Sequence, residues 1–397
     1  MGNAEPGTLG SYEVSQRMKT MYWSFTFLGV IAFVVTLINN PERAWAAYLV
    51  PLFYFMSLAL GGLFFASIQH ITKAGWSVNI RRISESFTSF IGIGSLATIL
   101  LLFGAPSLYI WLDPAVVAAD YILQHKAPYL NMPFFVIRTL LFLGLWILFA
   151  RIIIGRSLKQ DVNGDENLTQ KQIGISIGFI LFFSLSYSFF SVDFLMSLQP
   201  HWFSTIFGVY TFAGLFQSTI AFLVIAIVYL KNKGLLGNYV TADHLHDLGK
   251  FLFAFTVFWA YIAFSQYMLI WYANLPDETI FIIPRSEGQW LYVSLLLILG
   301  KFIVPFFALL PRWAKRNPSH LVAVSTLILV MQYVDIHWLV YPNINEDKVI
   351  FALPEILIFL GFLGLFVMTV TRFLSRNKLV PIKDPRLKES LDHHVVY

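Results

Sequence analysis

The chain has 397 residues, of which 57% are hydrophobic and 12% are charged, and its mean hydropathy is +0.69. A soluble domain cannot bury that much apolar surface, so the composition predicts an all-α polytopic membrane protein. The absence of cysteine excludes disulfides, thiolate metal sites and any iron–sulfur cluster held by this chain's own residues.

Ten apolar stretches follow one another along the chain, each near or above the ~20 residues that cross a hydrocarbon core as a helix. We expect an N-terminal tail over residues 1–20, a ten-helix membrane domain over residues 21–374 and a basic C-terminal tail over residues 375–397. The connections are short, and no soluble domain is predicted. The predicted spans are 21–38, 45–70, 84–104, 133–154, 172–198, 203–230, 251–274, 289–311, 320–341 and 350–371.

Ten spans place both ends of the chain on the same side of the membrane. With this topology, 21 of the 27 Lys and Arg residues lie on the side of the termini, and the positive-inside rule makes that side cytoplasmic. The same asymmetry explains the net charge of +5, so a nucleic-acid partner is not predicted. The four cations on the other side are Arg43, Lys126, Arg285 and Lys348, and the two inside spans are Arg138 and Lys301.

Short motifs predict loops and helix contacts. The polar loop at residues 159–170 is expected on the cytoplasmic side. The external connection at residues 105–132 is aromatic and carries a predicted short helix at residues 114–124, which favours an aromatic belt at the membrane interface over a partner-docking loop. Gly174 and Gly178 form a G-x-x-x-G pattern, which predicts a close helix contact.

Six ionisable side chains inside the predicted spans need an explanation. A charge there costs about 2.5–3.5 kcal/mol on insertion scales, so each needs a partner or a water-filled cavity. Lys301 is too deep to reach the interface easily, and we expect it to pair with an acid or to be neutral. Glu85 follows Arg81 by four residues and is either half of a surface ion pair or a proton-uptake group. The other four lie in the outer third of their helices: Arg138, Asp193, Asp335 and Glu355.

Further polar residues are expected at the same outer depth. His337 follows Asp335 but projects from the opposite side of its helix. Gln266 lies near the outer end of another span, and His201 and Trp202 occupy a tight turn between two spans. The outer set therefore predicts either a polar site at this depth or a group of structural ion pairs, such as Arg138 with one of the two aspartates.

Missing motifs exclude several classes of protein. None of the nine histidines lies at the middle of a predicted span, which excludes a transmembrane b-type haem held by facing histidines. The chain also lacks the G-x-x-x-x-G-K-[ST] phosphate loop and the H-E-x-x-H zinc motif, which excludes ATP hydrolysis and zinc-protease chemistry within this chain.

Residues 191–210 (SVDFLMSLQPHWFSTIFGVY) form a more specific pattern than any single charge. The motif D-x-x-M-S-L-x-P-x-W-x-S-T, which begins at Asp193, resembles the signature of the NrfD/PsrC-like membrane subunits of bacterial alternative complex III. The stretches K-F-x-x-P-F at Lys301 and D-x-x-W-x-x-x-P at Asp335 resemble later parts of the same family. With ten predicted spans, the resemblance extends over essentially the whole chain.

The resemblance implies two four-helix bundles with two flanking helices, in a subunit of a quinol:electron-acceptor oxidoreductase of the bacterial cytoplasmic membrane. The chain resembles the ActF-type subunit more than its ActC-type sibling, so it is expected to be either a non-catalytic or a quinone-binding subunit. It would hold no metal itself, and quinol or menaquinol would be the substrate. The implied partners are an ActC-like membrane subunit, an iron–sulfur subunit, c-type cytochrome subunits carrying haem c, and membrane lipid. The candidate quinone-binding residues are Asp193, His201, Trp202 and Gln266.

Quinol oxidation releases two protons with two electrons, so we also predict a proton path, with hydroxyls such as that of Tyr261 carrying bound water. Two other functions stay open. A stand-alone proton-coupled transporter also places charges inside the membrane and interrupts helices with proline, and a structural anchor uses ion pairs only to orient helices. The candidate proton-path residues are Glu85, Lys301, Asp193, Asp335, His337, Arg138 and Glu355.

Overall fold

The computed structural model describes residues 9–395, and within that range it contains helices and no strands. Ten helical segments are long and apolar enough to cross a membrane, which confirms the predicted all-α polytopic membrane protein. The first eight residues of the predicted N-terminal tail and the last two of the C-terminal tail lie outside the described residues.

Four spans of the N-terminal half form one helical bundle. Its elements are α2 (Pro41–Ile71), η1 (Gly75–Ser77), α3 (Val78–Phe87), η2 (Thr88–Phe90), α4 (Ile91–Leu108), α7 (Met132–Asn163) and α8 (Asn167–Phe194). The central helix is α2, which packs against α3, α4 and α8, while α7 packs against α8. Most of α2 is buried and it is apolar all round, as expected for a helix surrounded by other helices.

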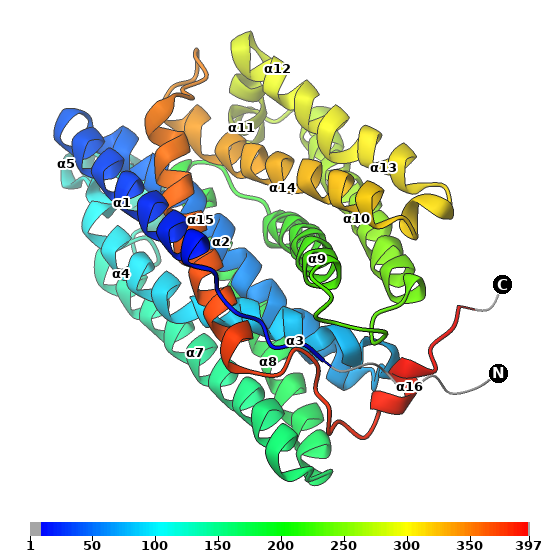
Figure 1. The fold of residues 1–397 in the computed structure, drawn as a ribbon. Helices are drawn as coiled ribbons and strands as arrows, with labels where there is room; N and C mark the ends of the chain where they lie inside the picture. The colour runs from blue at the N-terminus through cyan, green and yellow to red at the C-terminus, as the bar shows by residue number, and fades with distance from the viewer. Residues whose placement is uncertain (1–8, 396–397) are drawn as a thin grey trace.

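Four spans of the C-terminal half form the second bundle. Its elements are α9 (Phe207–Asn232), α10 (Ala242–Ala273), α12 (Gly288–Leu297), η5 (Ile298–Ile303), α13 (Val304–Leu309) and α14 (Pro318–Val340). Helix α9 packs against α10 and α14, and it also contacts α2 of the first bundle (Figure 1). A Cβ atom added to Gly61 of α2 would lie 1.9 Å from Thr219 Oγ1 of α9, so the two bundles meet at this glycine.

The two remaining spans, α1 (Gln16–Asn39) and α15 (Leu353–Arg376), lie side by side at the flank of the bundles (Figure 1). A Cβ atom on Gly29 would lie 2.6 Å from the Cα atom of Gly361, and one on Gly364 would lie 2.7 Å from the carbonyl oxygen of Tyr22. Small residues thus let the two backbones approach closely. The arrangement confirms the expected pair of flanking helices.

The predicted helix contact at the G-x-x-x-G pattern is wrong. A Cβ atom on Gly174 would meet nothing within 4 Å, and one on Gly178 would only touch the Phe149 ring at 3.8 Å. Spacing alone permits a close approach, but the neighbouring helix presents the bulky Phe149 side chain to this face of α8 and keeps the backbones apart.

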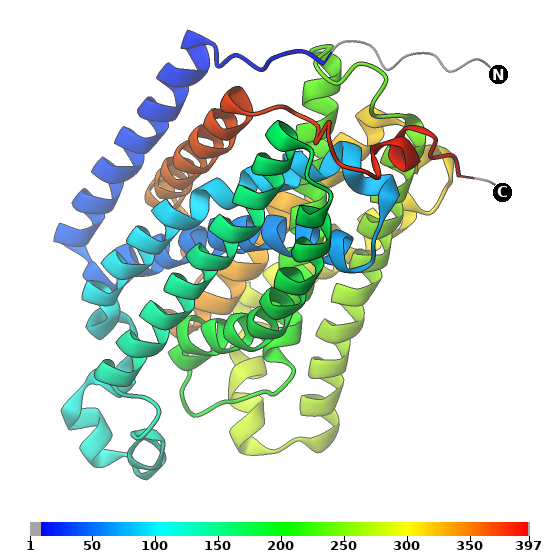
Figure 2. The same cartoon turned by 90° about the horizontal axis from the view of Figure 1, so that it is seen from below.

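Both described ends of the chain lie at one end of the helices, which we call the termini side. The short helices α5 (Pro114–Ala119) and α6 (Tyr121–Lys126) lie at the opposite end (Figure 2). They replace the single helix predicted over residues 114–124. Asp113 and Asp120 cap α5 and α6 through their carboxylates, so each aspartate starts a helix of its own.

Candidate functional site

The lysine in the middle of the membrane domain pairs with an aspartate of a neighbouring helix. Lys301 lies on η5, a short π-helical segment. Its Nζ atom is 2.5 Å from Asp335 Oδ2 and donates to Gln332 Oε1 at 2.6 Å. Both charged side chains are buried. The acid that balances the Lys301 ammonium is therefore Asp335 of α14.

Two aromatic side chains complete the environment of Asp335. Tyr210 of α9 donates its hydroxyl to Oδ1, and Trp259 of α10 donates Nε1 to Oδ2 at 3.2 Å. The Trp259 ring centroid also lies 4.4 Å from the Lys301 ammonium, which adds a cation–π contact. Four spans of the second bundle contribute to this Lys301–Asp335 cluster, which consists of Lys301, Gln332, Asp335, Tyr210 and Trp259.

The helix is irregular at Lys301 because Pro305 follows four residues later. Proline has no N–H, so the carbonyl oxygen of Lys301 loses its ordinary helical donor. Gln217 Nε2 lies 3.5 Å from that oxygen and donates to Thr256 Oγ1 at 3.0 Å. The π-helical turn and the neighbouring amide thus satisfy a backbone group that the proline leaves free.

A second buried ion pair lies in the first bundle, away from the termini side. Arg138 of α7 binds Asp193 of α8 through two hydrogen bonds, Nε to Oδ2 at 3.0 Å and Nη2 to Oδ1 at 2.9 Å. Tyr129 donates its hydroxyl to Asp193 Oδ1 at 3.0 Å, and its own carbonyl oxygen accepts from Arg138 Nη1 at 3.0 Å. We call these three residues the Arg138–Asp193 cluster. Of the two aspartates considered as partners of Arg138, the structure selects Asp193.

A cavity of about 370 Å³ borders the Arg138–Asp193 cluster, and Tyr129 and Trp202 are among its lining residues. The Trp202 ring is fixed by stacking on Phe281, with ring centroids 3.9 Å apart. Lys126 supplies a cation to the lining, and its Nζ atom donates to the carbonyl oxygen of Pro200 at 2.6 Å. A mainly apolar cavity with a few convergent polar groups can hold a flat organic ring.

The one histidine of the motif region, His201, does not join this cluster. His201 Nε2 lies 2.5 Å from Asp120 Oδ2, at the N-cap of α6. Hydrogen bonding by His201 lowers the pKa of Asp120, which favours the charged carboxylate. Among the predicted quinone-binding residues, therefore, Trp202 lines the cavity, Asp193 reaches it through Tyr129, and His201 serves a surface contact.

Two residues of α10 were predicted to take part in the site, Gln266 in quinone binding and Tyr261 in holding water. Gln266 is buried, and its Oε1 atom has no hydrogen-bond partner among residues 9–395. It is not among the lining residues of the 370 Å³ cavity. Tyr261 is 64% exposed, so the prediction that its hydroxyl carries water inside the protein is wrong. Its side chain lies on the outer face of the helix, where an amphipathic tyrosine suits a membrane environment.

Glu355 and His337 form a separate group near the start of α15. Arg43 binds Glu355 through two hydrogen bonds of 2.8 and 3.0 Å, and the Tyr341 hydroxyl donates to the same carboxylate at 3.1 Å. His337 stacks on Tyr341, with ring centroids 3.9 Å apart. His337 therefore projects away from Asp335, as its helical position predicts, and lies beside the Glu355 group instead.

The termini side holds a third buried cluster, centred on Arg82. Its guanidinium lies 3.0 Å from Glu85 Oε2 and 2.8 Å from Asp161 Oδ2. Ser157 of α7 donates to the Glu85 carboxylate at 2.9 and 3.0 Å. The predicted Arg81–Glu85 pair is longer, at 3.6 Å, and is buried instead of lying at the surface. We call this group the Arg82 cluster.

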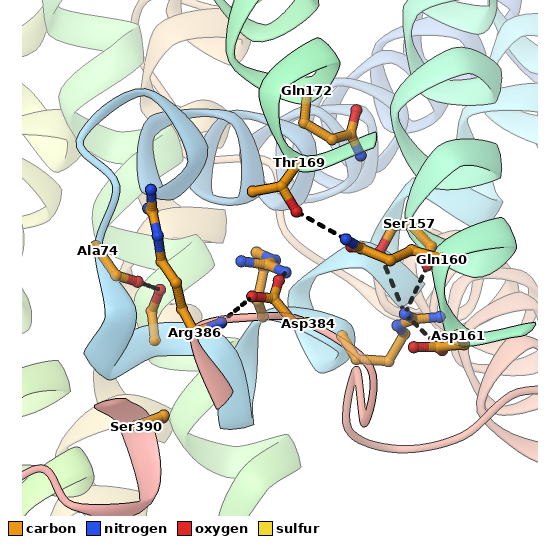
Figure 3. Close-up of polar contacts among 12 residues, drawn as sticks. Ala74, Ser157, Gln160, Asp161, Thr169, Gln172, Asp384, Arg386 and Ser390 are labelled. Carbon is orange, nitrogen blue, oxygen red and sulfur yellow. Dashed lines mark hydrogen bonds and ion pairs between the residues drawn. The ribbon is translucent and has the colours of Figure 1, made fainter. Parts of the chain in front are cut away.

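The described part of the C-terminal tail docks on the termini side. Arg81 Nη2 lies 2.5 Å from Asp384 Oδ2, which joins the tail to the Arg82 cluster (Figure 3). Ser390 donates its hydroxyl to the carbonyl oxygen of Trp76 at 2.7 Å, and Lys383 donates to that of Val162 at 2.5 Å. A tail predicted only from its basic charge is thus held by an acid and a hydroxyl as well.

Sequence reasoning missed a fully desolvated arginine on α11 (Pro276–Ser286). Arg285 is 2% exposed and donates to the carbonyl oxygens of Phe281, Trp338 and Leu339 at 2.7, 3.2 and 3.0 Å. Burial lowers the pKa of Arg285 to about 9, which still leaves it charged at neutral pH. From the sequence it is only one of the four cations on the side opposite the termini, between two predicted spans. The proline and two acids at residues 276–278 are the available signal that a helix begins there.

We expect Arg285→Met to destabilise the protein by about 2–3 kcal/mol, because three carbonyl oxygens lose a charged donor. Denaturant unfolding of the purified protein in detergent measures this change. Lys348→Met, at an exposed position near the same end of the molecule, is the matched control and should change stability by less than about 0.5 kcal/mol. Equal stability of the Arg285→Met variant and the parent would contradict the idea that these three hydrogen bonds stabilise the fold.

The fold and these clusters define a polytopic helical membrane protein whose buried ionisable residues lie in several separate clusters. Among residues 9–395, the predicted proton-path residues form two pairs, Arg138 with Asp193 and Lys301 with Asp335. Glu85 and Glu355 pair with arginines outside the predicted set, and His337 stacks on Tyr341. In the same part of the chain, no group of three or more His, Asp or Glu side chains is arranged to hold a metal ion. Comparison with known proteins finds no family model and no curated protein that matches the chain.

Proposed function

We propose that the chain is a membrane subunit of a quinol:electron-acceptor oxidoreductase related to bacterial alternative complex III, in the bacterial cytoplasmic membrane. One observation carries the proposal. The motif that begins at Asp193 supplies both the acid of the Arg138–Asp193 cluster and the aromatic ring of Trp202. Tyr129 connects the two, because it hydrogen-bonds to Asp193 and lines the same cavity as Trp202.

The chemistry of this arrangement suits a quinol. A headgroup in the cavity would meet the Tyr129 phenol, which is already hydrogen-bonded to a carboxylate that can accept a proton. Arg138 holds that carboxylate in place through two bonds and limits its movement. In the proposal, electrons leave to iron–sulfur and haem c groups of partner subunits, and this chain binds the quinol or supports the ActC-like sibling that does.

The Lys301–Asp335 cluster has a second role in the proposal. A buried lysine and aspartate that share a hydrogen bond can exchange one proton between two sites without leaving an unpaired charge. The Arg82 cluster offers a comparable acid, Glu85, on the termini side. We propose that these groups support proton movement that accompanies quinol oxidation.

Purification of the tagged full-length chain from its own membranes tests the assignment. We expect it to bring down an iron–sulfur subunit, c-type cytochromes detectable by haem staining and a homologous membrane subunit. The matched control is an unrelated polytopic protein with the same tag from the same membranes. A chain that purifies alone from membranes shown to contain quinol:acceptor activity would contradict the proposal.

A stand-alone proton-coupled transporter is the second candidate, and the irregular π-helical turn at Lys301 favours it. Irregular helical segments beside buried charges, like this turn and the Lys301–Asp335 pair, are typical of transporter binding sites. Proton uptake by liposomes that contain only this chain, driven by a solute gradient, would support the transporter. A purely structural anchor is the third candidate, since the buried charges already neutralise each other within their ion pairs. It predicts that conservative changes in the clusters alter stability and leave activity unchanged.

The proposed orientation follows from the asymmetric distribution of cations, and we expect the termini side to be cytoplasmic. The naturally cysteine-free chain allows a direct test with Glu166→Cys on the termini side and Tyr121→Cys at the opposite end, both at exposed positions. An impermeant thiol reagent should label position 121 in intact cells and position 166 only after permeabilisation. The reverse pattern would overturn the orientation.

A further inference from the structure

A cavity of about 560 Å³ opens on the termini side, where the beginning of α1 meets the end of α15. None of its lining residues belongs to the buried ion-pair clusters. The two helices carry complementary groups here, with aromatic rings and a cation from α1 and two cations and hydroxyls from α15. The lining residues that carry the argument are Lys19, Tyr22, Trp23, Arg372, Ser375 and Arg376.

The cavity has an excess of uncompensated positive charge. Lys19, Arg372 and Arg376 are all exposed, and their charged groups form no ion pair or hydrogen bond with another residue within 9–395. Glu13 is the one acid in the lining, so two positive charges exceed it. Arg81 and Arg82, on the same side of the molecule, are instead buried against carboxylates. The net positive charge of the lining therefore favours binding of an anion from outside the protein.

The cavity continues into an apolar stripe along α1. Trp23 lines the cavity and is 61% exposed, and Ile38 at the far end of the same helix is 78% exposed. Between them, Phe27, Val30 and Val34 are also exposed. Their spacing of three and four residues places all five on one face of the helix. This face turns away from α15 and runs from the charged cavity across the apolar length of the span.

We propose that the cavity binds the phosphate of an anionic membrane phospholipid, whose acyl chains lie along the exposed stripe of α1. Basic pockets between helices at the cytoplasmic boundary have the chemistry that recognises such headgroups. A free phosphate would use the cations but not the apolar stripe that starts at Trp23. The lipid would brace α1 against α15, the pair that meets at Gly29 and Gly361. This inference goes beyond the proposed enzymatic role and does not depend on it.

Binding of added lipid to the full-length protein, purified in detergent with whichever subunits accompany it, tests the proposal. The probes are phosphatidylglycerol, phosphatidylcholine with the same acyl chains, and inorganic phosphate, with native mass spectrometry as the readout. We expect phosphatidylglycerol to bind, and phosphatidylcholine and phosphate at the same concentration not to bind or compete. The triple variant Lys19→Gln/Arg372→Gln/Arg376→Gln should lose affinity by roughly fivefold per removed cation.

The matched control removes three cations from the same side but outside the cavity. The variant Arg151→Gln/Lys159→Gln/Lys171→Gln should bind phosphatidylglycerol as the parent does, since none of these residues lines the cavity. An equal loss of phosphatidylglycerol affinity in both triple variants would show that general surface charge causes the effect and would refute the proposed site. Competition by inorganic phosphate at the lipid concentration would identify free phosphate as the ligand and equally overturn it.

A charge-conserving variant separates binding from folding. Lys19→Arg/Arg376→Lys keeps all three cations and is expected to bind phosphatidylglycerol within about twofold of the parent, because the headgroup interaction depends mainly on charge. If this variant binds while the triple Gln variant, with a melting temperature equal to that of the parent, does not, the cations themselves hold the lipid. Unchanged binding by the folded triple Gln variant would refute the proposal.

Discussion

Replacing Lys301 by Met is expected to destabilise the folded protein by about 3–5 kcal/mol, because the change leaves Asp335 as an uncompensated buried carboxylate. The ammonium lies 2.5 Å from Asp335 Oδ2 and also donates to Gln332. Tyr210 and Trp259 would still donate to the carboxylate, but two neutral donors do not replace a cation. Denaturant unfolding of the purified protein in detergent measures the loss.

The double variant Lys301→Met/Asp335→Asn measures how much of the loss comes from the interaction between Lys301 and Asp335 themselves. We expect it to recover most of the lost stability, because the neutral amide oxygen can still accept from Tyr210 and no buried charge remains unpaired. An interaction energy near zero in this double-mutant cycle would contradict the pairing. Lys348→Met, which removes an exposed cation, should leave stability within about 0.5 kcal/mol of the parent.

The same variants address the proposed proton role. In liposomes that contain the assembled complex, Lys301→Met should lower the number of protons moved per electron if the cluster relays protons. An assembled Lys301→Met complex with unchanged stoichiometry and rate would remove Lys301 from that role. The stability cycle and the proton count can therefore fail independently, because the first tests architecture and the second tests mechanism.

The spans could be predicted from the sequence because the thickness of the hydrocarbon core sets a length that hydropathy alone detects. The third span shows the limit of that method. Hydropathy predicts its start at residue 84, whereas the helical segment begins at Gly75 and contains Arg81 and Arg82. These arginines lie inside the protein because Glu85, Asp161 and Asp384 neutralise them. A hydropathy average cannot register a charge that is cancelled by a distant residue.

The partners of the buried charges could be predicted only in part. Depth along each helix indicates that Lys301 needs an acid, but the choice of Asp335 depends on which helices are neighbours. The docking of Asp384 on Arg81 joins residues that are 303 positions apart in the chain, and no local pattern signals it. The burial of Arg285 could not be predicted, because its partners are backbone carbonyls, which every sequence supplies and none identifies.

Replacing Asp193 by Asn is expected to lower quinol:acceptor turnover by at least tenfold, because a neutral amide cannot accept the proton that the proposal assigns to this carboxylate. Loss of general acid–base help typically costs about 10²- to 10⁴-fold. The amide oxygen can still accept from Arg138 and from the Tyr129 hydroxyl, which now bind the carboxylate, so the complex should assemble. Turnover and the recovery of partner subunits are the two measurements.

Two further variants sharpen the assignment of Asp193. Tyr129→Phe removes the hydroxyl that connects the carboxylate to the cavity and should also slow turnover, while Asp277→Asn, at an exposed position on the same side of the molecule, should not. A role in proton transfer further predicts that Asp193→Asn changes the pH dependence of turnover, which a purely structural ion pair would leave as it is. An assembled Asn variant with the parent's rate, proton release and pH profile would reduce the Arg138–Asp193 cluster to a brace between α7 and α8.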